Sequence, residues 1–173
     1  WVNTGSTTTE PPLSLNMVKA EGLSGFSDFA LGTQYCKVVT NGNDDGIGSL
    51  RFAIAQCSNP EDYIYIAEFI DSIFLVSDTI ILDKNLSIFH SGNEKVVIQT
   101  TSSSPVFKTN PGVLITLNNI EIHSGGVASS KALLNNGNTI LWNVDIINSI
   151  PGEIPVMNTG ILEISETVQI KNQ

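Results

Sequence analysis

Two acidic side chains, Glu121 and Asp145, occupy equivalent positions in a repeated strand pattern and could do chemistry together. If the two strands stack in register, the carboxylates lie roughly 4.8 Å apart. Carboxylates this close can serve acid–base catalysis or bind a cation. Gln169 takes the third position of the column, and no cleft-forming insertion flanks it. We therefore expect a solvated outer face and predict no catalytic residues.

A polar loop offers a second candidate site, for a cation. Asn41, Asn43 and Asp45 match positions 1, 3 and 5 of a calcium loop, with Gly46 at position 6. An EF-hand requires a bidentate acid at position 12, where this chain has Phe52. We interpret the loop as a helix-entry turn. A calcium ion held by the three side-chain oxygens and by carbonyls is the alternative.

The two histidines, His90 and His123, each precede Ser-Gly and are expected at corners of different coils. No Cys or acidic residue recurs beside them, so we predict turn residues rather than metal ligands. We expect no metal and no cofactor.

Composition limits the classes of partner. The net charge is −9, and the eight Lys and Arg residues are scattered, which argues against nucleic-acid binding. No apolar run approaches the ~20 residues of a membrane helix, so we do not expect the chain to span a membrane.

The elements that would position these side chains are strands recurring about every 24 residues. Ile120, Val144 and Val168 are 24 residues apart twice in succession, each within a polar–apolar–polar–apolar tetrad. Such a period predicts a solenoid, because a single coil cannot bury its apolar face alone. Further strands are expected at 36–40, 63–66, 72–76, 79–82, 86–89 and 96–100.

Two finer alignments follow from this interpretation. Leu86-Ser-Ile88 is predicted to be the same strand as Ile120-Glu-Ile122, one longer coil earlier. The later coils share an apolar pair followed by a Gly turn, at Gly112, Gly137 and Gly160. The three pairs are Val106-Phe107, Leu133-Leu134 and Val156-Met157.

A short amphipathic helix is predicted at about 49–57. Ser49 is a natural N-cap, and Leu50, Ala53, Ile54 and Cys57 follow the i, i+3, i+4, i+7 spacing of one helix face. Ahead of stacked β coils, such a helix would cover the open end of the core.

Cys36 and Cys57 are the two cysteines of the chain. A disulfide closing the loop between them would stabilise it by about 3 kcal/mol in the chain-entropy model. Two buried thiols are the alternative.

The first 34 residues differ in composition from the rest. They contain a Thr/Ser-rich start, a Pro11-Pro12 break and a Gly-rich apolar segment at 22–32, too little to form a core. We expect an N-terminal arm, or the end of a preceding β domain, over 1–34 and the solenoid over 35–173. The start at Trp1 suggests a processed product or a piece of a longer protein.

The segment from Thr40 to Ile54 resembles the "N-D-x-G-x-G-S-L-R-x-A-I" opening of parallel β-helix domains in large bacterial surface proteins. Asn43, Asp44, Gly46, Gly48, Ser49, Leu50, Arg51, Ala53 and Ile54 fill the pattern. Asp62-Tyr-Ile-Tyr-Ile66 is similar to the "D-x-I-x-F" strand that follows, with Ile in place of Phe, and Lys84-Asn-Leu-Ser-Ile88 to the "L-x-I" strand. The resemblance implies an all-β fold: a right-handed parallel β-helix of about four to five coils with a short N-terminal capping helix. An antiparallel sandwich is the alternative.

The resemblance also implies roles for the cap residues Ser49, Leu50, Arg51 and Ile54. Arg51 is expected to bond turn carbonyls, Asp44 or Asp45 rather than clamp a ligand. The segment 22–32 resembles the closing strands of β-sandwich modules in secreted Bacteroidota proteins, which often leave by the type IX secretion system. Asp-Ser72-Ile and Asp-Thr79-Ile fit the short O-glycosylation pattern of that phylum.

These features together predict a non-catalytic β-helix module of a secreted or surface-displayed bacterial protein. It would serve as an adhesin, a stalk or exported type IX cargo, located outside the cell. A polysaccharide lyase or glycosidase, or a carbohydrate-binding module, is the alternative. Because no capping segment follows the last coil, Val168 and Ile170 are expected to meet a protein partner or a further domain. Secretion machinery or a glycan is a further expected partner.

Overall fold

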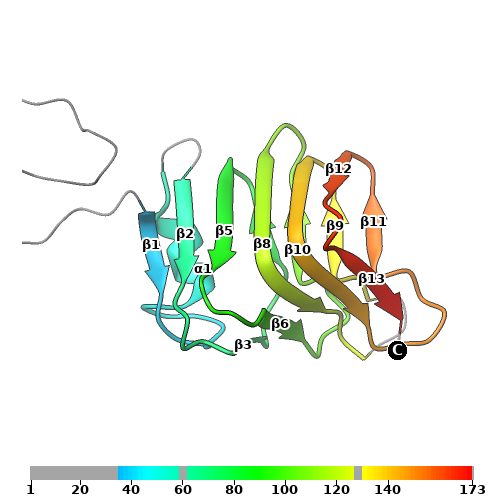
Figure 1. The fold of residues 1–173 in the computed structure, drawn as a ribbon, viewed down its shortest axis with the longest axis horizontal. Coiled ribbons are helices and arrows are strands. Elements are labelled where there is room, and N and C mark those ends of the chain that lie inside the picture. Colours follow the sequence, from blue (N-terminus) through cyan, green and yellow to red (C-terminus); the bar gives the residue numbers. More distant parts are fainter. Residues whose placement is uncertain (1–34, 59–61, 127–129, 173) are drawn as a thin grey trace, which may run out of the picture. The chain divides into compact units, whose positions relative to one another are not determined.

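The computed structural model describes residues 35–58, 62–126 and 130–172. The predicted arm at 1–34 lies outside the described residues. The described part is a right-handed parallel β-helix of about five turns with one short helix, which confirms the predicted fold (Figure 1). All the strand pairs are parallel, so the alternative of an antiparallel sandwich is wrong.

Each complete coil contributes strands to three faces of the solenoid. The first face contains β1 (Tyr35–Val39), β2 (Asp62–Ile66), β5 (Leu86–His90), the first halves of β8 (Leu114–His123) and β10 (Asn138–Asn148), and β12 (Ile161–Ile164). The second face contains β3 (Ser72–Leu75), β6 (Val96–Thr100), the second halves of β8 and β10, and β13 (Gln169–Asn172). The third contains β4 (Ile80–Leu82), β7 (Phe107–Thr109), β9 (Leu133–Asn135) and β11 (Val156–Asn158).

The core is built from columns of inward-facing side chains, one residue per coil. On the first face, register partners form the column Ile64, Ile88, Leu117, Leu141 and Ile164. On the second face, a column runs through Ile73, Ile98, Ile122, Ile146 and Ile170. All members except the last of each column are fully buried. Alternation with period two places every second residue in this core.

The 24-residue recurrence marks one of these columns. Ile120 and Val144 are register partners and buried, and Val168 packs against the core in the next coil. The prediction that these three residues share a stacked column is therefore confirmed.

The predicted equivalence of Leu86-Ser-Ile88 with Ile120-Glu-Ile122 is wrong. Leu86 pairs with Ile115 on the first face, whereas the strand one coil before Ile120 is β6, in which Val96 pairs with Ile120. The error arose because β8 is a bent strand that serves two faces. Leu114–Asn118 and Ile120–His123 therefore belong to different columns, although they are one strand in sequence.

The predicted alignment of apolar pairs is off by one residue. Phe107 pairs with Leu133, which pairs with Val156, so Val106 corresponds to Ala132 rather than to Leu133. Met157 is exposed on the outer surface. Only the first residue of each later pair faces inward, because neighbours along a strand point to opposite sides.

Asparagines make the corner between the first and second faces. Asn119 and Asn143 adopt positive φ values of 59° and 50°, which bends β8 and β10. The Asn143 side chain donates to Asn119 Oδ1 at 2.8 Å. Asn119 in turn donates to the Gly92 carbonyl at 2.7 Å. This ladder satisfies buried amide groups and holds each coil over the one before it.

A second ladder lies at the corner that follows the third face. Asn135 Oδ1 accepts from the hydroxyl groups of Thr109 at 2.6 Å and of Thr139 at 2.8 Å, and its amide donates to Asn158 Oδ1 at 2.8 Å. Glycine is required at the adjoining turn, since a Cβ on Gly160 would overlap the carbonyl oxygen of Gly137 in the coil below.

The helix α1 (Leu50–Gln56) takes the place of strands in the first coil. Ser49 Oγ accepts the backbone N–H of Phe52 at 3.2 Å, as an N-cap should. Leu50, Ala53 and Ile54 are buried in the common core. The predicted capping helix at 49–57 is therefore confirmed.

Candidate functional site

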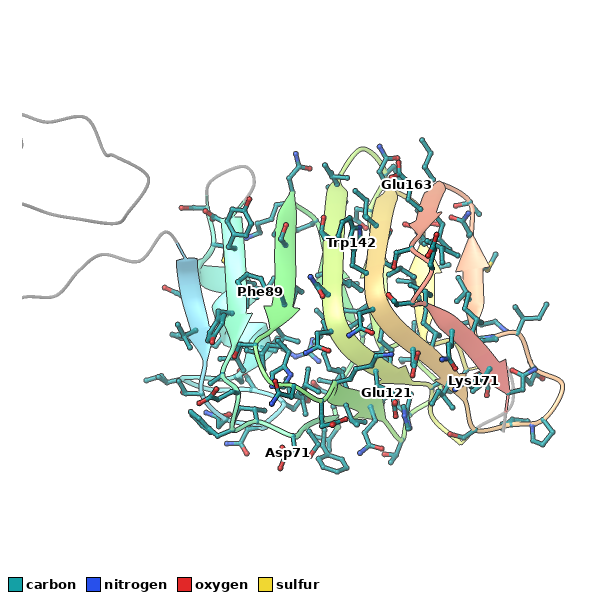
Figure 2. All side chains as sticks on the ribbon, in the orientation of Figure 1. Asp71, Phe89, Glu121, Trp142, Glu163 and Lys171 are labelled. Carbon is teal, nitrogen blue, oxygen red and sulfur yellow. The ribbon has the colours of Figure 1, made fainter. Side chains whose placement is uncertain are left out.

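The two candidate catalytic carboxylates lie side by side on the outer side of the second face. Glu121 and Asp145 are register partners, and Gln169 follows in β13 (Figure 2). Lys95 Nζ lies 2.8 Å from Asp145 Oδ1, an ion pair by distance but without hydrogen-bond alignment. His123 Nε2 contacts Glu121 Oε1. Each carboxylate therefore has its own basic neighbour.

This cluster of Lys95, Glu121, His123 and Asp145 can hold a proton or bind a polar group at the surface. All four side chains are partly exposed, between 13% and 25%. Each residue is fixed by the strand that carries it, so the cluster is rigid. No cavity detected in the described structure is lined by any of the four.

Sequence reasoning missed Lys95 as a member of this cluster, although a signal was present. Lys95-Val-Val-Ile98 is a further copy of the tetrad, 24 residues before Asn119-Ile-Glu-Ile122. His123 had been expected at a corner, away from acidic groups. The structure places it at the end of β8, two residues after Glu121 and on the same side of the strand.

The capping loop is centred on Asp44 and Arg51. The Arg51 guanidinium donates to Asp44 Oδ1 from Nε at 3.2 Å and from Nη2 at 2.9 Å. Its Nη1 also donates to the Thr79 carbonyl at 3.2 Å. Asp44 Oδ2 accepts the backbone N–H of Ser77 at 2.7 Å and the Ser77 hydroxyl. The pair therefore ties the loop before α1 to the turn between β3 and β4.

Asp44 is the residue whose titration the structure perturbs. Burial opposes the charged form, but hydrogen bonds from the Ser77 side chain, from Arg51 and from the Ser77 backbone outweigh it. Together they hold the pKa of the Asp44 carboxyl below its ordinary value.

Comparisons of this chain with protein-family models, with curated proteins and with solved structures find no match.

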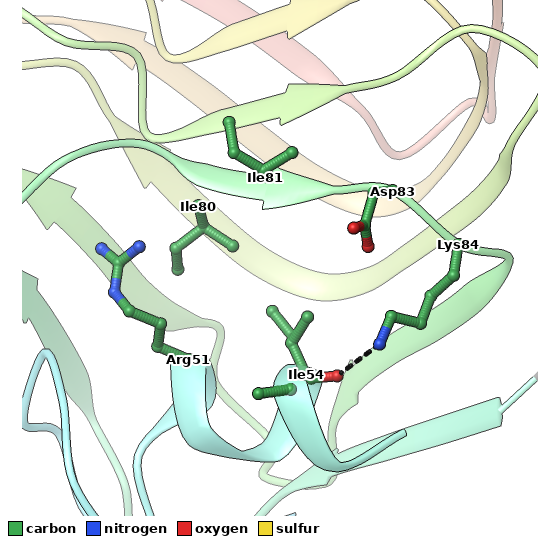
Figure 3. Close-up of a pocket in the computed structure, with 7 residues that line it drawn as sticks. Arg51, Ile54, Ile80, Ile81, Asp83 and Lys84 are labelled. Carbon is green, nitrogen blue, oxygen red and sulfur yellow. Dashed lines mark hydrogen bonds between the residues drawn. The ribbon is translucent and has the colours of Figure 1, made fainter. Parts of the chain in front are cut away.

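A shallow pocket lies between α1 and β4 (Figure 3). Its polar lining consists of Arg51, Asp83 and Lys84, over an apolar floor that includes Ile54 and Ile80. Lys84 Nζ donates to the carbonyls of Ile54 at 3.2 Å and Cys57 at 2.7 Å, at the C-terminal end of the helix. Because both cations bond protein groups, the pocket closes the cap against the solenoid rather than presenting free donors to a ligand.

The residues of the predicted calcium loop hold the turn itself. The Asn41 amide donates to the Ile47 carbonyl at 2.9 Å, and its Oδ1 accepts the Asn43 N–H at 3.1 Å. Asp45 Oδ1 accepts the Gly46 N–H at 2.7 Å. Gly48, at φ +86°, allows the turn into Ser49. Across the described residues, no three His, Cys, Asp or Glu side chains are grouped to hold a metal ion.

The remaining predicted positions are spread over the solenoid. Ser72 begins β3 and Thr79 precedes β4, both partly exposed, and their O-glycosylation stays a prediction. His90 is buried, with Nδ1 3.0 Å from the Glu94 carbonyl oxygen. Cys57 is disulfide-bonded. The Cys36 side chain lies outside the described ones, so its pairing with Cys57 stays a prediction. Within the described chain, no helix is long and apolar enough to cross a membrane.

Proposed function

We propose that this chain is a non-catalytic β-helix module of a secreted or surface-displayed bacterial protein. It would act as an adhesin, a stalk or exported cargo of the type IX secretion system. The observation that carries the proposal is the asymmetry of the solenoid, with a helix over the first coil and nothing described over the last. This is the geometry of a segment meant to be continued or bound at one end.

The last described coil supports docking through its edge. Ile164 and Ile170 end the core columns and are 50% and 45% exposed, whereas their predecessors Leu141 and Ile146 are fully buried. Exposed apolar columns beside unpaired strand edges favour the addition of further strands. We therefore propose that a protein partner or a further domain stacks on β11, β12 and β13.

Two features support a location outside the cell. The disulfide at Cys57 would persist in an oxidising compartment and is unusual in the bacterial cytosol. The sequence likeness of the capping loop to bacterial surface proteins points the same way. The type IX route rests on the likeness of the segment 22–32 alone.

The open edge can be tested by sedimentation velocity of the chain over a range of concentrations. We expect the wild-type chain to associate through its last coil, because a purified sample offers no other cover for Ile164 and Ile170. The variant Ile164→Lys should remain monomeric. A wild-type chain that is monodisperse and monomeric at every concentration would count against a docking end.

A polysaccharide lyase or glycosidase is the second candidate, favoured by the adjacent carboxylates Glu121 and Asp145. Their pairing with His123 and Lys95 supports the non-catalytic alternative, because each charge is already balanced. Incubation with uronic-acid and neutral polysaccharides, followed by measurement of new reducing ends or unsaturated products, separates the two. We expect no turnover. Turnover that is lost in Glu121→Gln or Asp145→Asn would establish the enzyme instead.

A further inference from the structure

An aromatic row crosses the outer side of the first face, far from the charged cluster of the second. Tyr65 on β2 pairs in register with Phe89 on β5, Phe89 with Asn118 on β8, and Asn118 with Trp142 on β10. These four residues, named here the aromatic row, occupy one position on four successive strands. Figure 2 places Phe89 and Trp142 on this same side of the solenoid.

The rings of the row are held in place yet reachable. Tyr65 and Phe89 pack edge to face with their centroids 5.3 Å apart, and Tyr63 packs on Phe89 at 6.4 Å. Trp142 stands at the other end of the row and is 58% exposed. Large exposed rings on a rigid sheet contribute contact area with little loss of conformational entropy on binding.

The surface around the row is uncharged. On β2, β5 and the first halves of β8 and β10, the outward side chains are Tyr63, Tyr65, Ser87, Phe89, Leu114, Thr116, Asn118, Asn138, Ile140 and Trp142. None of them is charged, in a chain whose net charge is −9. Recognition of an anionic polymer requires Arg or Lys donors, which these strand segments do not offer. The surface therefore fits a neutral ligand.

The geometry of the row fits an extended polymer lying along the solenoid axis. Neighbouring strands are roughly 4.8 Å apart, so Phe89 and Trp142, two strands apart, are separated by about 9.6 Å along the stack. Each strand would meet one pyranose unit of such a polymer. The apolar C–H face of a sugar ring packs on an aromatic face, while its hydroxyl groups bond amide and hydroxyl side chains. Asn118 and Thr116 lie between the rings and offer those groups.

We propose that the aromatic row is a binding site for a neutral linear polysaccharide, with Trp142, Phe89 and Tyr65 as stacking platforms and Asn118 as a hydrogen-bonding partner. The site goes beyond the module function proposed above and does not depend on it, since a stalk, a cargo protein or an enzyme could each carry it. It uses different strands and different residues from the docking edge of the last coil.

The test is affinity gel electrophoresis of the wild-type chain in gels containing xylan, mannan, hydroxyethylcellulose or mixed-linkage β-glucan, with polygalacturonate as the anionic comparison. We expect retardation by at least one neutral polymer and none by polygalacturonate. Trp142→Ala should weaken binding by at least about tenfold, as loss of a stacking aromatic does on other polymer-binding surfaces. Trp142→Phe should retain most of it.

Phe69→Ala is the matched control, because Phe69 is an equally exposed aromatic, 67% exposed, outside the row. It should leave retardation unchanged, and circular dichroism should show all three variants folded. The proposal is overturned if no neutral polymer retards the wild-type chain, or if Trp142→Ala binds as well as the wild type. It is also overturned if Trp142→Ala abolishes self-association in sedimentation instead, since the row would then be a protein contact.

Discussion

The two ends of this solenoid carry the same kind of apolar column but treat it differently. At the first coil, Leu50 and Ile54 of α1 lie over the core and are buried with it. At the last coil, Ile164 and Ile170 continue the same columns and remain about half exposed. The side chains are equivalent in type and in register. Burial at each position therefore depends on whether another layer covers it.

The difference shows which interactions make an end. The first coil is closed by more than apolar contact, because the Asp44–Arg51 pair and Lys84 bond the loop and the helix to later strands. The last coil has neither a helix nor such bonds among its described residues, and its strands pair on one side only. A closed end requires polar bonds that reach across coils, whereas an open end needs only the repeat to stop.

The largest expected effect is loss of apolar contact at the closed end. Leu50→Ala should lower the free energy of unfolding by about 3 kcal/mol, since it removes a fully buried side chain and leaves a cavity. Ile164→Ala is the matched change at the open end and should cost less than about 1 kcal/mol, because half of that side chain is already in water. Urea unfolding of both variants measures the difference. Equal losses would mean that the last coil is covered in solution.

A smaller effect is expected from the ion pair of the cap. Asp44→Asn should cost about 2 kcal/mol, because it removes charge-assisted hydrogen bonds to Arg51 and Ser77. Asp83→Asn, at an exposed acidic position near the same helix, is the control and should change stability little.

The Asp44 effect should also depend on pH. Its folded-state pKa is below the ordinary value of 3.8, so the carboxylate stabilises the fold fully above that value. The contribution is lost as the pH falls through the lowered, folded-state pKa. The gap between wild type and Asp44→Asn should therefore close in acid, in urea unfolding across that range. A gap that persists unchanged would show that the charge of Asp44 is not what holds the loop.

The smallest expected effect is at the end of the helix. Lys84→Met keeps the aliphatic stem but removes the ammonium donor to the carbonyls of Ile54 and Cys57. We expect a loss of about 1 kcal/mol, typical of a hydrogen bond at a helix terminus. Lys108→Met, on the outer side of β7, is the control. Equal losses in the two variants would remove Lys84 from the capping system.

Much of the fold could be predicted because the sequence repeats it. The tetrads at Ile120, Val144 and Val168 are local patterns, and the helix beginning at Ser49 has its own capping signal. What could not be predicted depends on the bend. Nothing in the sequence alone says that Asn119 and Asn143 adopt positive φ and split one strand between two faces. For that reason, the alignment of Leu86–Ile88 was wrong.

The candidate site was predicted in part, for a related reason. Adjacency of Glu121 and Asp145 follows from the repeat, but the contact with Lys95 depends on a coil whose opening strand had been aligned elsewhere. The aromatic row escaped notice because its members, Tyr65, Phe89 and Trp142, are separated by 24 and 53 residues and share no common period. Only the register of β2, β5, β8 and β10 brings them together.

The contrast between a closed first coil and an open last coil is tested most directly by amide hydrogen exchange of the whole chain, measured by mass spectrometry on a sample shown to be monomeric. We predict strong protection for α1, β2 and β5, and exchange faster by several orders of magnitude for β12 and β13, whose outer edges lack partners. Protection of β12 and β13 as strong as that of β5 in the monomer would contradict an open end.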